Sequence, residues 1–355
     1  MTMNAPLSAT RPTGESDFVC PTIAEVVAGT ASGQTRVGQA VIGTFASGMP
    51  IMIPVMVARA FEPGPTLWLN GAVHGDELNG VLASLDFFHA LDGRLQKGTV
   101  VVTPICNPVA LDARRKRVPQ DELDLDQNFP GRAGGSLSQR LAYALFEGIR
   151  AQADVVVNFH TMNPYFESEP YAVYKGDASA KVAESDLLGM VACFSPFVAC
   201  RMITSSAGEL PGDNSGALDY QVLNLGKAAI MVELGGGSRQ VPAHIEAGRA
   251  GLERLAVFMG LLPDSGAPPS RGVRRVTRRT HVFSEHGGFF RQHARAGSLL
   301  KAGECLGEIQ DYAGRLLQRV TYDQDVLIIG IRCDPVVHTG DRIGFIGLEW
   351  EEIDA

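Results

Sequence analysis

The segment Trp68-Leu-Asn-Gly-Ala-Val-His-Gly-Asp-Glu-Leu-Asn-Gly80 decides the fold, because an apolar run ends within it and a polar turn follows. Residues 66–73 are typical of a buried strand, and residues 80–91 are typical of a helix. Open α/β sheets carry their functional side chains where strands end. His74 and Glu77 stand at this point, and residues three apart on a helical turn face the same side. Both can therefore bind one metal ion, although the same spacing also occurs in polar turns that cap a helix.

Extended and helical segments alternate on both sides of this stretch. The expected strands are a hairpin at 35–60 and the segments 66–73, 98–105, 154–159, 197–203 and 228–234. The expected helices are 80–91, 136–153, 180–194, 215–225 and 242–262. This alternation predicts an α/β fold with a mostly parallel mixed sheet flanked by helices.

The composition changes at both ends of this alternating region. Residues 1–33 are rich in Thr, Ser, Pro, Gly and Ala, and we expect a flexible N-terminal head before an α/β domain at 34–265. The stretch 263–270 has the composition of a linker. Beyond it, residues 271–355 form short β segments separated by glycines, which predicts a small all-β barrel or sandwich. Five arginines at 271–279 are expected to lie on a solvated strand face.

The overall composition limits the possible functions of the 355-residue chain. A formal net charge of −8 disfavours nucleic-acid binding, and no apolar run reaches the roughly 18 residues of a membrane-spanning helix. No secretory signal is evident, and the six cysteines form no CxxC pair. Reduced thiols of this kind favour the cytoplasm, and their spacing disfavours a cysteine-based zinc site.

Chemically active side chains follow four of the expected strands. They are His74 with Glu77; Asn107 with the basic stretch 114–117 and the acidic run 124–131; His160; and Glu233. In a parallel sheet these positions converge on one edge. A His, a Glu and a second His are the ligand set of many zinc hydrolases, which leave one coordination position for water. The pattern therefore predicts a metal site.

The same residues carry a resemblance to a known family. His74-Gly-Asp-Glu77, Asn107-Pro108, the Leu-x-x-x-Phe-Pro-Gly run that begins at Leu125, His160 and Glu233-x-Gly resemble the succinylglutamate desuccinylase/aspartoacylase family. That family is related to the zinc carboxypeptidases. The resemblance covers about residues 36 to 262, and the C-terminal β domain is also similar to that of the family. Within the family, the glycine-rich Glu233-Leu-Gly-Gly-Gly237 and the β tail resemble the deacetylases of N-acetyl-diaminobutanoate.

The resemblance implies a role for each of these residues. One zinc ion per chain would be bound by His74, Glu77 and His160. Glu233 matches the general base, and Arg117 is the counterpart of an arginine that orients the substrate at the scissile carbonyl. Arg114 or Arg115 takes that place if the loop register differs. The expected substrate-binding residues are Asn107, Arg114, Asp126 and Gln127.

One departure from the family pattern concerns the substrate. The family has Asp-Leu-Asn-Arg before Phe-Pro-Gly, whereas this chain has Asp124-Leu-Asp-Gln127. Arginine offers a two-pronged contact to a carboxylate, but Gln127 offers only a neutral amide. Either the substrate lacks that carboxylate contact or another cation supplies it. Asp126 adds a negative charge, so we also hypothesise a cationic substrate group near it.

The resemblance thus implies a zinc-dependent amidohydrolase that removes the acyl group of a small N-acyl amino acid. N-acetyl-diaminobutanoate and N-succinyl or N-acetyl amino acids are the expected substrates, and a homo-oligomer is possible. The alternatives are a carboxypeptidase-like zinc peptidase and a non-catalytic relative that binds a small ligand. Among the histidines of the β domain, His286 is expected to lie in a surface loop, with an approach to the site from the second domain as the alternative.

Overall fold

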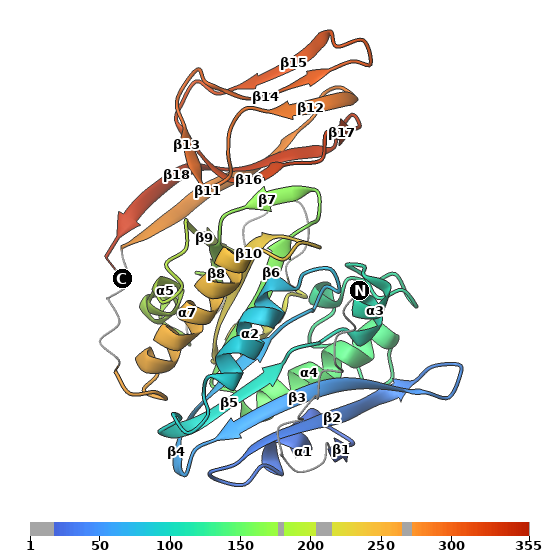
Figure 1. The fold of residues 1–355 in the computed structure, drawn as a ribbon, viewed down its shortest axis with the longest axis vertical. Helices are drawn as coiled ribbons and strands as arrows, with labels where there is room; N and C mark the ends of the chain where they lie inside the picture. Colours follow the sequence, from blue (N-terminus) through green and yellow to red (C-terminus); the bar gives the residue numbers. More distant parts are fainter. Residues whose placement is uncertain (1–17, 177–180, 204–214, 265–271, 355) are drawn as a thin grey trace, which may run out of the picture.

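The computed structural model describes residues 18–176, 181–203, 215–264 and 272–354. A 14-stranded mixed sheet runs through these residues, and a second sheet of four strands packs at one end (Figure 1). The strand order of the large sheet is β1-β2-β3-β5-β4-β6-β10-β8-β9-β11-β18-β16-β13, with β7 paired to β16. The predicted fold class is confirmed. No helix within the described ranges is long and apolar enough to span a membrane.

The N-terminal edge of the sheet corrects one expectation. The predicted hairpin is formed by β2 (Thr35–Thr44) and β3 (Pro50–Arg59), and β1 (Phe18–Cys20) pairs with β2 in parallel. Helix α1 (Ile23–Ala28) buries three apolar side chains against this edge. The expectation of a flexible head is therefore wrong from residue 18 onward, because apolar residues anchor the segment; residues 1–17 lie outside the described part.

Four adjacent parallel strands form the centre of the sheet. They are β5 (Lys97–Thr103), β4 (Glu62–Asn70), β6 (Val155–Met162) and β10 (Ala228–Gly236). Runs such as 67–69 and 100–102 are fully buried, since helices cover both faces. The four strands run in the same direction, so their carboxyl ends lie at one edge of the sheet.

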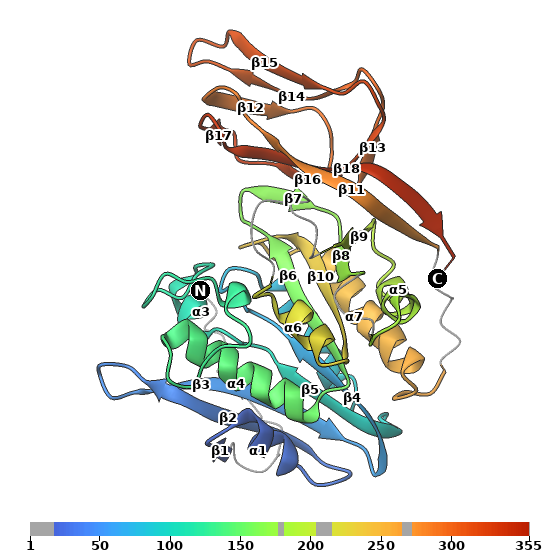
Figure 2. The same cartoon turned by 180° about the vertical axis from the view of Figure 1, so that it is seen from behind.

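The helices lie on both faces of the central strands. Helices α2 (Asn79–His89) and α7 (Pro242–Phe258) pack together on the face seen in Figure 1. Helices α4 (Leu137–Gln152) and α6 (Leu218–Asn224) lie on the other face, seen in Figure 2. Helix α4 starts at a capping box between Ser136 and Gln139, and its apolar residues four apart are buried. Two further helices are α3 (Pro108–Ala113) and α5 (Glu184–Ala192).

The C-terminal β region continues the large sheet instead of forming a separate body. Strand β11 (Val273–Phe283) pairs with β9 (Ala199–Met202) on one side and with β18 (Arg342–Ile353) on the other. Strands β16 (Val326–Arg332) and β13 (Ser298–Leu300) complete the large sheet. The second sheet contains β15 (Leu316–Thr321), β14 (Cys305–Gln310), β12 (Gly288–Gln292) and β17 (Val336–Val337). A separate apolar core fills this region, while residues 265–270 of the predicted linker lie outside the described residues.

Two short strands were not predicted from the sequence. β7 (Phe166–Ser168) pairs with β16, and β8 (Tyr171–Lys175) lies between β10 and β9. Both are too short to show a clear alternation of apolar and polar residues. They matter because β8 connects the central strands to the C-terminal region.

The arginine-rich strand β11 agrees only in part with the expected solvated face. Three of its arginines form ion pairs with glutamates across β18, namely Arg274 with Glu352, Arg275 with Glu351 and Arg278 with Glu349. Arg279 is instead buried, and its guanidinium donates to the backbone carbonyl of Arg201. The bulges that β11 forms with β18 around Arg278 turn Arg279 inward.

Candidate active site and metal centre

His74 and Glu77 lie in the loop that joins β4 to α2, not on the first turn of the helix as expected. A turn brings them together, since the Glu77 amide donates to the His74 carbonyl at 3.3 Å. Gly75 allows this loop to pass close to α3, because a Cβ there would lie 2.1 Å from the Ala110 carbonyl. Asn107 fixes the same loop, since its Nδ2 donates to the Val73 carbonyl at 3.1 Å. The two site residues are therefore positioned by packing between loops.

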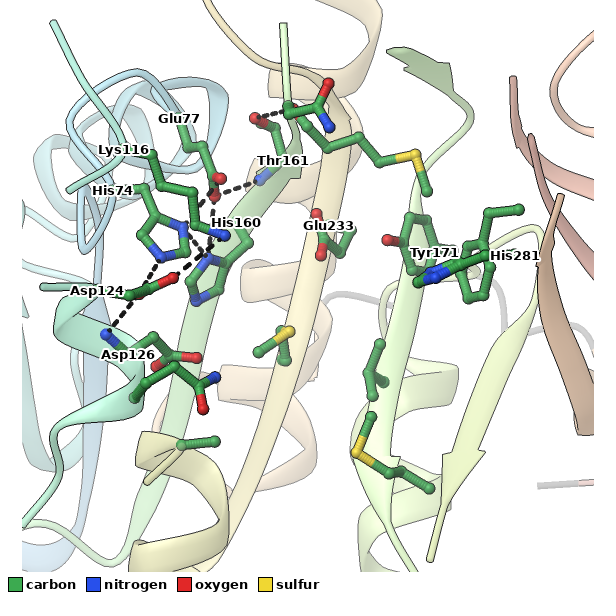
Figure 3. A pocket seen from close by; sticks show the side chains of 18 of the residues that line it. His74, Glu77, Lys116, Asp124, Asp126, His160, Thr161, Tyr171, Glu233 and His281 are labelled. Carbon is green, nitrogen blue, oxygen red and sulfur yellow. Dashed lines mark hydrogen bonds and ion pairs between the residues drawn. The ribbon is translucent and has the colours of Figure 1, made fainter. Parts of the chain in front are cut away.

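The strand register places three further polar side chains in a row. His160 lies within β6, where the sequence predicted that the strand had already ended. It is the register partner of Glu233 on β10, and Glu233 is in turn the partner of Tyr171 on β8. Residues in register on adjacent strands point to the same face. Figure 3 shows Glu233 between His160 and Tyr171.

The buried side chains of His74, Glu77 and His160 converge on one point. Each imidazole Nδ1 lies 2.9 Å from a different oxygen of Glu77. The two Nδ1 atoms are 3.2 Å apart. The Thr161 amide also donates to the second Glu77 oxygen at 3.0 Å, which holds the carboxylate in place. All three residues thus direct a possible ligand atom toward the same small volume.

Electrostatics at this point favour a bound cation. Burial alone lowers the pKa of His74, but the Glu77 charge and the hydrogen bond to Asp124 raise it, to about 10. Burial raises the pKa of Glu77, yet the two histidines hold it well below its usual range. The carboxylates therefore create a negative potential that attracts positive charge.

Asp124 determines which nitrogen of His74 is free for a metal. Its Oδ1 lies 2.9 Å from Nε2 of His74, and the pKa of Asp124 is held far below its usual range by His74 and Lys116 against the effect of burial. An ionised carboxylate only accepts hydrogen bonds, so Nε2 carries a proton, and loss of the second proton from Nδ1 on metal binding would direct the Nδ1 lone pair at the point shared with Glu77 and His160. This carboxylate–histidine arrangement is common behind zinc ligands. The donor set therefore fits a divalent metal such as zinc.

Glu233 has the properties of a general base. It lies in the same cavity as the three candidate ligands, and its Oε2 is buried with no hydrogen-bond partner among the described residues. Burial and the charge of Glu77 raise the pKa of Glu233 to about 7. A carboxylate of this pKa can accept and return a proton near neutral pH.

The basic stretch 114–117 does not contribute the expected arginine to the cavity. Arg114 ends α3 in a left-handed conformation and is exposed, while Arg117 is exposed and donates to the Glu122 carbonyl at 3.2 Å. Arg115 forms an ion pair with Glu122. Lys116 is the member of the stretch that lines the cavity, with its Nζ 3.3 Å from Asp124. Four consecutive basic residues gave no sequence signal for which one points inward.

The other expected substrate-binding residues divide into two groups. Asp126 and Gln127 line the cavity, as the acidic run predicted. Asp126 is buried and accepts from Asn158 Nδ2 at 3.3 Å, and that same Nδ2 lies 2.9 Å from His160 Nε2. Asn107 does not line the cavity, because its side chain caps α3 and supports the loop before His74.

The cavity has a second wall that the sequence did not reveal. It is about 250 Å³ in volume, and residues of β8, β11 and β18 line the side opposite the candidate metal ligands. These residues include Tyr171, Arg279, His281, Arg342 and Phe345. His281, rather than His286, is the histidine of the β domain that reaches the site (Figure 3). In the sequence, His281 is notable only for following an arginine-rich run. The pairing of its strand with others was needed to show that it lines the cavity.

Comparison with known proteins identifies the family. Residues 63–259, more than half of the chain, match the succinylglutamate desuccinylase/aspartoacylase catalytic domain. The chain belongs to this family. Its named members are deacylases, so this family member is an amidohydrolase by class.

Individual relatives agree with this assignment. The N-alpha-acetyl-L-2,4-diaminobutyric acid deacetylase of Halomonas elongata is 27% identical over 304 residues, which cover 83% of this chain and 85% of that enzyme. A succinylglutamate desuccinylase structure from Silicibacter has a TM-score of 0.77 at 20% identity, covering 91% of this chain and 96% of that one. The product-bound ectoine utilization protein EutE (DoeB) of Ruegeria pomeroyi has a TM-score of 0.76 at 22% identity, covering 90% and 96%. The two structures show that the whole described fold, including the C-terminal β region, recurs in these proteins.

Proposed function

We propose that this family member is a zinc-dependent deacylase that hydrolyses the amide bond of a small N-acyl amino acid. The observation that carries the proposal is the position of Glu233, a buried carboxylate beside a His–Glu–His group in one cavity. N-acetyl-2,4-diaminobutanoate is the first candidate substrate, because the similar Halomonas enzyme is named for it.

The proposed reaction assigns a task to each side chain. Zinc, held by His74, Glu77 and His160, would polarise the scissile carbonyl and make the attacking water more acidic. Glu233 takes a proton from that water as its oxygen bonds to the carbonyl carbon. Glu233 then gives this proton to the leaving nitrogen as the carbon–nitrogen bond breaks.

Lys116 takes the electrostatic task that the sequence assigned to Arg117. It is the cation of the basic stretch that lines the cavity, and its ion pair with Asp124 holds it near His74. A positive charge at this position stabilises the oxyanion that develops on the carbonyl oxygen. Because Lys116 is half exposed at the cavity mouth, we expect its contribution to be smaller than that of a buried donor.

Asp126 supports a substrate that carries an amino group. Its carboxylate lines the cavity beside Gln127, where the family pattern has Asn and Arg. Burial raises the pKa of Asp126, and the nearby Asp219 and Asp124 raise it further, although the histidines oppose this. A substrate ammonium group would relieve this crowding of negative charge. A diamino acid derivative provides such a group.

A peptidase activity is less well supported by the shape of the site. Residues of the C-terminal region close one side of the cavity, and its volume is about 250 Å³. This is below the range of roughly 300–1,000 Å³ of sites for drug-sized ligands. An extended peptide needs a long groove, whereas a short N-acyl amino acid fits a cavity of this volume.

The test combines metal analysis with a substrate screen. Purified protein is analysed for bound metal and assayed for amine release from N-acetyl, N-succinyl and N-acetyl-diamino acids, with short peptides as comparison. We expect about one zinc per chain and turnover of at least one N-acyl amino acid. Protein that binds zinc but releases amine only from peptides supports the peptidase, and zinc binding without any turnover supports the non-catalytic alternative.

A further inference from the structure

The wall opposite the candidate metal ligands contains a basic side chain with an unusual environment. Arg342, at the start of β18, lines the cavity and is half-buried. Its guanidinium lies over the Phe166 ring, 4.6 Å from the ring centre, and Nη1 is 3.2 Å from Nε2 of His281. Neither group carries a negative charge. Arg342 forms no ion pair with any residue in the described ranges.

Three arginines on the adjacent strand differ from Arg342 in having ion-pair partners. Arg274, Arg275 and Arg278 on the adjacent strand each have a glutamate of β18 within 2.7 Å. Arg274 and Arg278 pair with exposed glutamates, where an ion pair contributes little, and Arg275 pairs with Glu184 of α5 as well. Arg342 faces the cavity, where desolvation makes a missing counter-ion costly. The protein thus keeps, at a place where a ligand can reach it, a cation that interacts with Glu233 across the cavity but has no ion-pair partner among the described residues.

His281 cannot supply the missing charge, but it can orient the guanidinium. Burial and the positive charges of Arg342 and Arg279 lower the pKa of His281 to about 4, so the ring is neutral at neutral pH. Its Nε2 therefore accepts a hydrogen bond from Arg342. The His281 ring packs against Phe345 with centroids 5.2 Å apart, and Phe345 in turn packs against Tyr171 at 6.2 Å. This aromatic contact chain connects Arg342 to the row that contains Glu233.

The remaining basic residues of the cavity already have partners. Lys116 pairs with Asp124, and Nζ of the buried Lys175 lies 2.6 Å from Asp219. Arg279 donates to the Arg201 carbonyl. By contrast, the wall around the metal ligands is acidic. Carboxylates thus gather near the candidate metal ligands, whereas Arg279 and Arg342 line the cavity from β11 and β18. Figure 3 shows Glu233 between His160 on the first side and Tyr171 on the second.

We propose that Arg342 binds the carboxylate of the substrate, and that it replaces the arginine whose position in the family pattern is occupied by Gln127. This inference rests on the proposed deacylase function and names the substrate class more closely: an N-acyl amino acid with a free carboxylate. Arginine is suited to this task because two of its N–H groups can contact both carboxylate oxygens. Stacking on Phe166 and the contact with His281 hold the guanidinium in one orientation before the substrate binds.

The test compares two substrates that differ only in charge. They are N-acetyl-2,4-diaminobutanoate, or another N-acyl amino acid that the wild type hydrolyses, and its carboxamide, in which a neutral amide replaces the carboxylate. In Arg342→Gln, we expect kcat/KM for the acid to fall roughly 10- to 100-fold, as for the loss of a charged hydrogen-bonded pair. Turnover of the carboxamide should stay close to the wild-type value, because it never makes that contact.

Two further variants keep the result interpretable. Arg278→Gln removes an outward-facing arginine and should leave both substrates unaffected. Arg342→Lys keeps the charge without the two-pronged contact, so it should recover part of the loss for the acid alone, and it replaces Arg342→Gln if that variant does not fold. Equal losses for acid and carboxamide in the Arg342 variants would overturn the inference, since a structural residue affects both substrates alike. A wild-type protein that hydrolyses no N-acyl compound overturns the proposed function instead.

Discussion

The two walls of the cavity are built in different ways. The metal-side wall comes from the α/β region, where His74, Glu77, His160 and Glu233 lie at the ends of adjacent parallel strands. The opposite wall is assembled from β8, β11 and β18, which meet through antiparallel and parallel pairings between distant parts of the chain.

The difference between the walls suits two different tasks. The metal-side wall concentrates carboxylates and imidazoles within hydrogen-bond distance, as metal binding and proton transfer require. The opposite wall offers Arg342, a cation next to aromatic rings that forms no ion pair with the described residues, and this is suited to recognition. Substitutions in the first wall should therefore remove metal or turnover, and those in the second should change substrate preference or stability. The predictions below test this division, from the largest expected effect to the smallest.

Loss of a metal ligand should have the largest effect. His160→Ala removes one of two imidazoles that face Glu77, so we expect loss of bound zinc and of detectable turnover. Metal analysis of the purified variant measures the first, and an amine-release assay measures the second. His281→Ala, a histidine of the opposite wall, should keep its zinc. Full zinc occupancy in His160→Ala would mean that the ion binds elsewhere.

Removal of the proposed general base should slow the reaction strongly without loss of metal. Glu233→Gln keeps the shape of the side chain and removes its ability to accept a proton. We expect kcat to fall roughly 10²- to 10⁴-fold with zinc content unchanged. The matched control is Glu246→Gln on the surface of α7, which should retain wild-type turnover. Glu233 has no role in proton transfer if Glu233→Gln turns over at the wild-type rate.

Asp124 should affect the affinity for the metal through its contact with His74. Asp124→Asn weakens the contact that keeps the proton on Nε2 of His74, so we expect zinc affinity to fall roughly 10- to 100-fold. Competition with a chelator of known affinity measures this change. Asp325→Asn, which alters an exposed ion pair with Lys301, serves as the control. Unchanged affinity in Asp124→Asn would show that His74 is oriented by other contacts.

His281 should make a small, pH-dependent contribution to stability. Its folded pKa is about 4, below the ordinary value of 6.5, so the folded state disfavours its protonated form. This contribution is therefore complete above pH 6.5 and is lost as the pH falls toward 4. His281→Gln cannot take up the proton, and its Tm should fall less steeply than that of the wild type between these pH values. Parallel Tm curves for the two proteins would contradict the assigned pKa.

Much of the metal-side wall could be predicted because its signals are local. The apolar runs 66–73 and 228–232 each predict a strand, and the polar residue that follows, His74 or Glu233, marks the end of the run. Parallel strands then bring these ends to one edge, whatever the details of the loops. The loops themselves were predicted less well. Lys116 rather than Arg117 lines the cavity, and neither this choice nor the left-handed conformation of Arg114 has a local sequence signal.

The opposite wall could not be predicted because its residues meet only through pairing between distant strands. Tyr171 lies on a five-residue strand, and His281 and Arg342 become neighbours when β11 pairs with β18 across about 60 residues of sequence. The sequence places His281 shortly after the arginines at 271–279, for which we predicted a solvated strand face. Burial inside the sheet gives it a different environment.

The sequence by itself thus determined the fold class, the family resemblance and the residues that converge at the strand ends, because short-range hydrophobic periods specify strands and helices. Only the tertiary structure decided that Asp124 orients His74, that Asn107 supports a loop and that Arg342 faces Glu233 across the cavity. The physical reason is that charge, burial and hydrogen bonding depend on neighbours in space, and those neighbours come from strands and loops far apart in the chain.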